Sequence, residues 1–151
     1  MQVDTHADKI QRMVQLRERL DPLRDFELWY WTSLTAGTNI WNAVLHMAGL
    51  TSEERVFSTI PGVHVVPQPD GTYRRELRGP ADVSHVGWPP VPGQMPAHVQ
   101  QLEAALHGLE EHRDPCLRGD RQPTQAIVDE CDRAFERALA IFNQSYPRHA
   151  P

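Results

Sequence analysis

The chain has 151 residues, a formal net charge of −5, 23% charged residues and 40% hydrophobic residues. This length and composition are those of one globular domain with a buried core, so we expect a single domain over residues 1–151. An acidic balance argues against nucleic-acid binding, because proteins that bind nucleic acids neutralise phosphates with a basic surface.

Two helices are predicted in the first third of the chain. Over residues 4–20, Ile10, Met13 and Val14 form one apolar stripe. A second helix is expected over residues 22–49, because Asp21-Pro22 is a typical helix start and Gly49 a typical stop. Gly37, in its middle, weakens this helix by about 1 kcal/mol relative to Ala, unless another segment needs the close approach.

The second helix carries no Asp, Glu, Lys or Arg between residues 28 and 52. At 100° per residue, Thr35, Asn39, Asn42 and His46 form one polar stripe on a surface that is otherwise mostly apolar or small. Buried polar groups need partners, so the stripe should meet another helix, a second copy of the chain, water or a ligand. We interpret it either as a hydrogen-bonded seam or as a small-molecule pocket with His46 as the acid/base or ligand group.

Membrane insertion of this uncharged segment is not expected. The segment is long enough to span a bilayer, but it is rich in Thr, Ser, Asn and His, and no basic cluster flanks it. The first eleven residues lack the apolar core of a signal peptide, and two cysteines make no disulfide framework. We therefore predict a cytoplasmic protein without a membrane partner.

The segment between residues 51 and 96 is rich in proline, which disfavours long helices. The Asp70-Gly71 turn between two short β-prone runs predicts a β-hairpin over about residues 62–77. A Pro-rich loop is expected over residues 78–96, and Trp88 suggests that this loop packs against the domain as a lid.

Two further helices are predicted, over residues 97–112 and 123–143. The first has leucines at helical spacing, and the second has a broad apolar stripe that includes Cys131 and Phe135. The sequence thus predicts an all-α fold: a four-helix bundle with the hairpin and the Pro-rich loop inserted between the second and third helices.

The eight histidines show no pair at i and i+4 on one helix, so no metal ligand and no cofactor are predicted. His98 falls in the apolar sector of the third helix and could approach the polar stripe of the second. His85 precedes it in the loop. The residues predicted to bind a ligand are Thr35, Asn39, Asn42, His85, Trp88 and His98, with His46 as the candidate catalytic residue.

The sequence favours a non-catalytic binding or accessory protein that acts as a homo-oligomer or as a subunit of a protein complex. The alternative is a small enzyme or small-molecule-binding protein, with a pocket on the polar stripe under the Pro-rich lid. A helical ribonuclease is a third alternative, because Arg78 and His85 are separated by six residues, although Gly79-Pro80 would interrupt a helix there.

Overall fold

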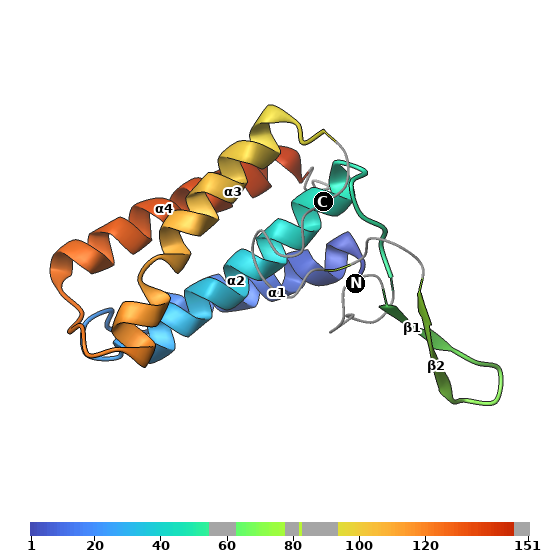
Figure 1. The fold of residues 1–151 in the computed structure, drawn as a ribbon, viewed down its shortest axis with the longest axis horizontal. Coiled ribbons are helices and arrows are strands. Elements are labelled where there is room, and N and C mark those ends of the chain that lie inside the picture. The colour runs from blue at the N-terminus through green and yellow to red at the C-terminus, as the bar shows by residue number, and fades with distance from the viewer. Residues whose placement is uncertain (55–62, 78–81, 83–93, 147–151) are drawn as a thin grey trace.

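A computed structural model of the chain describes residues 1–54, 63–77, 82 and 94–146. Four α-helices make up most of this part: α1 (Val3–Arg17), α2 (Phe26–Met47), α3 (Ala97–Glu110) and α4 (Gln125–Ser145). Figure 1 shows them as two antiparallel pairs, with α1 beside α2 and α3 beside α4. The predicted helical fold with four helices is confirmed.

The second helix begins four residues later than expected, and the reason is local. The Asp21 carboxylate accepts hydrogen bonds from the backbone N–H groups of Leu23 and Arg24, at 3.0 and 2.8 Å. Asp21-Pro22 therefore starts a separate turn, and α2 begins only at Phe26. The chain also forms a short π-helical turn, Asp114–Arg118, which the sequence did not predict.

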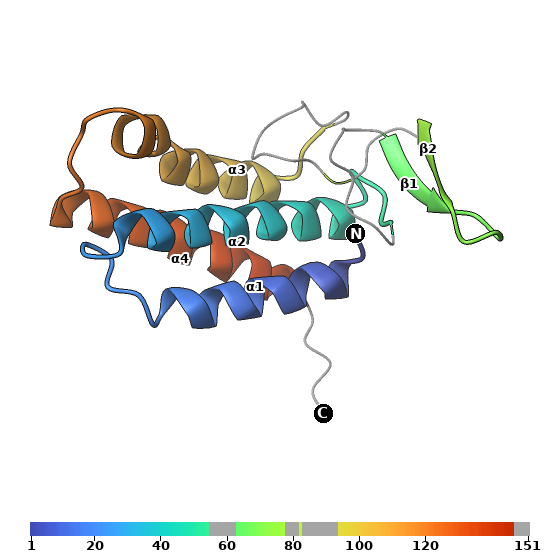
Figure 2. The ribbon, with the colours of Figure 1, turned by 90° about the horizontal axis from the view of Figure 1, so that it is seen from below.

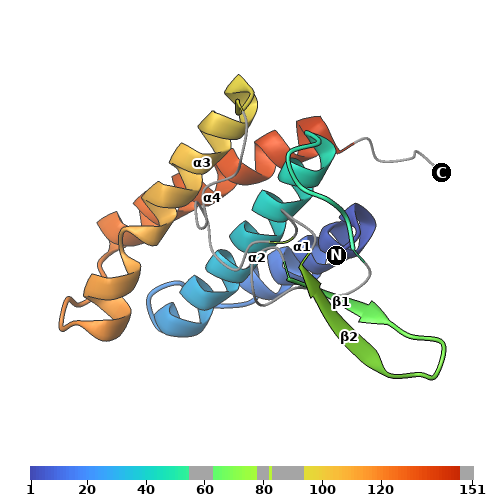
Figure 3. The same cartoon turned by 45° about the vertical axis from the view of Figure 1, so that its right-hand side comes forward.

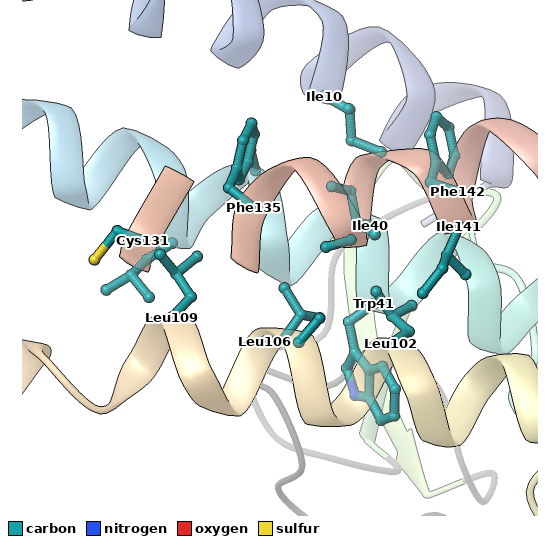
Figure 4. Close-up of a cluster of buried hydrophobic side chains, with 14 of the residues drawn as sticks. Ile10, Ile40, Trp41, Leu102, Leu106, Leu109, Cys131, Phe135, Ile141 and Phe142 are labelled. Carbon is teal, nitrogen blue, oxygen red and sulfur yellow. The ribbon is translucent and has the colours of Figure 1, made fainter. Parts of the chain in front are cut away.

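The hydrophobic core lies where α2 meets the α3–α4 pair (Figure 4). Trp41 of α2, Leu102 and Leu106 of α3 and Phe135 of α4 are almost completely buried. A Cβ atom at Gly37 would lie 2.9 Å from Cδ2 of Leu106, so the glycine permits the close approach of α3 to α2. This accounts for a glycine in the middle of a buried helix.

Two antiparallel strands, β1 (Val63–Pro67) and β2 (Tyr73–Leu77), follow α2, with Val63 opposite Leu77 and Pro67 opposite Tyr73. Gly71 has a φ of 83° in the turn between them, where the left-handed region favours glycine. Figure 3 shows the pair extending away from the helices. Of the predicted Pro-rich loop, the structure describes residues 82 and 94–96.

Among the described residues, no helix is long and apolar enough to cross a lipid bilayer.

Candidate metal centre

The antiparallel packing of α1 on α2 brings the start of α1 beside the end of α2 (Figure 2). His6 lies in the second turn of α1, four residues before the buried Ile10, and so points to the same face of that helix. His46 lies in the last turn of α2. Their imidazole rings are 5.6 Å apart, centroid to centroid, and both side chains are fully buried.

Asp82 supplies a carboxylate to this pair of histidines. Its Oδ1 atom lies 3.1 Å from Nε2 of His6 and 2.7 Å from Nε2 of His46. Its Oδ2 atom accepts a hydrogen bond from the α-amino group of Met1. Three side chains from three separate segments thus meet in a site from which solvent is excluded, and we call His6, His46 and Asp82 the triad.

Asn39 determines which nitrogen of His6 carries a proton. The amide Nδ2 of Asn39 donates to the backbone carbonyl of Thr35, at 2.8 Å, so its Oδ1 atom is the one that faces His6. This oxygen lies 2.9 Å from Nδ1 of His6 and only accepts, so Nδ1 must donate. The Nε2 atom of His6 can then face the Asp82 carboxylate only if it holds a proton or a cation.

Thr51 holds the other histidine, and the end of α2 places it there. Gly49, with a φ of 69°, ends the helix in a Schellman motif, in which the N–H of Leu50 donates to the carbonyl of Leu45 at 3.0 Å. The chain then turns back, and the Thr51 hydroxyl lies 2.7 Å from Nδ1 of His46. A hydroxyl both donates and accepts, so it suits either tautomer of this ring.

The electrostatics of the triad are dominated by Asp82. Burial alone would raise the pKa of its carboxyl, but hydrogen bonds from His46, His6 and the Met1 amino group outweigh that effect. The pKa of Asp82 is therefore held well below its usual range, and the carboxylate is negatively charged at neutral pH.

Most polar side chains of α2 form a hydrogen bond within their own helix. The hydroxyls of Thr32, Ser33, Thr35 and Thr38 donate to the backbone carbonyl four residues earlier in the helix, and so do the amides of Asn39 and Asn42. This bonding within the helix explains how an uncharged helix tolerates so many polar side chains. Asn39 and His46 also bond outside the helix, to His6, Asp82 and Thr51.

The structure brings together only part of the set predicted to bind a ligand. Asn39 and His46 lie at the triad, Asn42 is buried, and the Thr35 side chain is exposed. His98 is exposed in the first turn of α3, not packed against α2 as its sector suggested. His85 and Trp88 lie outside the described residues.

Sequence reasoning missed His6, Thr51 and Asp82. Metal sites are recognised in a sequence by ligand pairs within one helix, whereas these three side chains come from separate segments. One signal was present: His6 extends the apolar stripe of α1 by one turn, which predicts burial for a polar side chain. Nothing in the sequence around Asp82 marked it for this position.

The triad has the dimensions of a metal site. One ligand atom from each residue lies within 4.8 Å of the other two. Adjacent ligands at bond lengths of about 2.1 Å are roughly 3.0 Å apart at right angles and about 3.4 Å apart in a tetrahedron. The two separations from Asp82 Oδ1, 2.7 and 3.1 Å, are close to the first value.

Comparison of the chain with models of protein families, with curated proteins and with solved structures finds no match.

Proposed function

We propose that the chain is a metal-binding protein whose centre is formed by Nε2 of His6, Nε2 of His46 and Oδ1 of Asp82. The observation that carries this proposal is the convergence of the three atoms on one buried point. Asn39 and Thr51 hold the far nitrogens of the two imidazoles, as outer hydrogen-bond partners do for metal-bound histidines. The three candidate ligand atoms and the groups that would orient the two imidazoles therefore both support the proposal.

The donor set selects the class of metal. Two neutral imidazoles and one carboxylate suit borderline divalent ions such as Fe²⁺ and Zn²⁺, whereas Cu⁺ prefers thiolate and thioether ligands. Three protein ligands do not fill a four- or six-coordinate ion, so coordination positions remain for water or a small oxygen ligand. When bound, such an ion acts as a Lewis acid and lowers the pKa of a coordinated water.

A purely structural role explains the triad less well. Removing charged groups from water costs several kcal/mol per ion, and buried ion pairs can often be replaced by apolar side chains without loss of stability. Here a carboxylate, two imidazoles and an amino group share one buried point. Costly buried titratable groups of this kind cluster at functional sites.

Metal binding also accounts for His46 better than a role as general base does. A general base needs a free ring nitrogen within reach of the proton it removes. Both nitrogens of His46 contact protein groups, Asp82 on one side and Thr51 on the other. As a metal ligand, His46 would keep the contact between Nδ1 and Thr51. The ion would replace the proton on Nε2, the nitrogen that faces Asp82.

The test is calorimetric titration of the full chain, freed of metal by a chelator, with Zn²⁺ and separately with Co²⁺. We expect one ion per chain. The variants His6→Ala, His46→Ala and Asp82→Asn should each lose more affinity than the roughly 10- to 100-fold that loss of an outer hydrogen-bond partner costs. With Co²⁺, the wild-type spectrum should show nitrogen and oxygen ligation.

Two exposed histidines of α3 provide the matched controls. His98→Ala and His107→Ala remove an imidazole of the same kind from a solvated surface, and binding should be unchanged. Circular dichroism identifies any variant that fails to fold, and Asp82→Asn is the most conservative of the three. Equal affinity in the triad variants and the controls would overturn the proposal.

A second candidate function is self-association, favoured by exposed apolar side chains at the start of α2. Leu28 and Trp31 are 54% and 40% exposed, and with Thr35 they follow one face at helical spacing. Large apolar side chains grouped on a surface often mark protein contacts.

Light scattering after size exclusion tests this second candidate. A wild-type dimer that Leu28→Glu and Trp31→Glu convert to a monomer, with metal binding intact, would support it. A wild-type monomer at high concentration would reject it and leave the metal proposal unaffected.

A further inference from the structure

A groove with a volume of about 700 Å³ lies between α1 and α4. The apolar residues of its lining are Ala7, Ile10 and Val14 of α1 and Leu139 and Phe142 of α4. Ile10 and Phe142 are buried in the core, whereas Val14 and Leu139 are half-buried and accessible from the groove.

The rim of this groove on α1 is acidic. Asp4, Asp8 and Glu18 line it, all three are exposed, and no Lys or Arg is among the described residues of the lining. At 100° per residue they fall on one stripe of the helix. From Asp4 to Glu18 the stripe runs for about 21 Å, at 1.5 Å per residue.

We propose that this groove binds a basic amphipathic helix of a partner protein. A helix of about 14 residues matches the length of the acidic rim. Its apolar face would cover Val14 and Leu139, and Lys or Arg side chains beside that face would lie against the three carboxylates. The charge complementarity argues for a partner rather than a second copy, because this chain carries a net charge of −5.

The probe is a synthetic 15-residue peptide with Leu at helical i, i+3, i+4 and i+7 spacing and Lys at the other positions. A fluorescent label on the peptide reports binding to the full chain by anisotropy. Asp8→Asn with Glu18→Gln should weaken binding by at least roughly fivefold and reduce its dependence on salt. Leu139→Ser should weaken binding without changing the salt dependence.

The matched control changes the same charge elsewhere. Glu27 and Asp120 are exposed and do not line the groove, so Glu27→Gln with Asp120→Asn should bind the peptide as the wild type does. A second control peptide, with Glu in place of Lys, should not bind.

Three results would overturn the proposal. In the first, both double variants weaken binding equally, which indicates non-specific attraction to an acidic protein. In the second, amide chemical shifts move on other helices and not on α1 and α4. In the third, the groove variants change the oligomeric state of the chain alone, which makes the groove an interface between copies.

Discussion

The Oδ1 atom of Asn39 lies 2.9 Å from Nδ1 of His6, across the contact between α2 and α1. The amide cannot turn over without losing its bond to the Thr35 carbonyl. Asn39 therefore selects the tautomer of His6 that presents Nε2 to Asp82. Asn39 thus fixes the orientation of the His6 ring without belonging to the triad.

Asn39→Ala should consequently weaken metal binding by roughly 10- to 100-fold without abolishing it, because His6 loses its orientation but keeps its ligand atom. Thr35→Ala is the control. It removes a neighbouring exposed hydroxyl that donates to the Trp31 carbonyl of its own helix, and it leaves the carbonyl that holds Asn39 in place. Calorimetric titration with Zn²⁺ measures both variants. Equal affinities in the two would show that Asn39 does not act on the site.

The two helical glycines should respond in opposite directions to substitution by alanine. At Gly108 the new Cβ would lie 4.0 Å from its nearest neighbour, the Cβ of Ala134. Gly108→Ala should therefore raise the free energy of unfolding by about 1 kcal/mol through helix propensity alone. At Gly37 the new methyl would lie 2.9 Å from Leu106, so Gly37→Ala should gain nothing or destabilise. Urea unfolding measures the free energy of unfolding of both variants. An increase for Gly37→Ala as large as that for Gly108→Ala would contradict the close packing of α3 on α2.

Arg17 holds the other end of α1 in place. Its guanidinium lies 4.5 Å from the ring centre of Trp29 and 4.4 Å from that of Phe135, and it pairs with Asp132 of α4. Lysine keeps the charge but lacks the planar group that stacks between two rings. Arg17→Lys should lower the free energy of unfolding by about 1–3 kcal/mol. The control Arg19→Lys, at an exposed position, should change it little, and equal effects would contradict the stacked arrangement.

The two cysteines should differ in reactivity. Burial, with a smaller contribution from Asp132, raises the pKa of the Cys131 thiol to about 12. Thiolate is the reactive form, so Cys131 should resist labelling by maleimide in the folded protein even as the pH rises from 7 to 9. Cys116 is only half-buried, so one label per chain is expected in the native state and two in denaturant. Labelling of native Cys116→Ser would contradict the burial of Cys131.

The sequence predicted the helices well because each carries its own periodic signal. The apolar stripes of α3 and α4 and the capping glycine Gly49 are local features, and the structure bears them out. The start of α2 was misplaced because Asp21 caps a turn instead of the helix. Such competition between two local structures is not visible in a pattern of residue types.

The site was predicted only in part, because it depends on contacts between distant segments. His46 and Asn39 stood out as polar groups on a buried helix. His6 and Asp82, however, are 40 and 36 residues from His46 in sequence, and Asp82 is 76 from His6. Only the antiparallel packing of α1 on α2, and the return of the chain to the end of that pair, brings them together.

We expect an ion to bind between the two imidazoles and the carboxylate. A crystal of the chain loaded with Zn²⁺, with data collected on both sides of the zinc absorption edge, tests this most directly. We predict one anomalous peak at about 2.0–2.2 Å from Nε2 of His6, Nε2 of His46 and Oδ1 of Asp82. A structure with no peak there, and with Asp82 still hydrogen-bonded directly to both histidines, would contradict it.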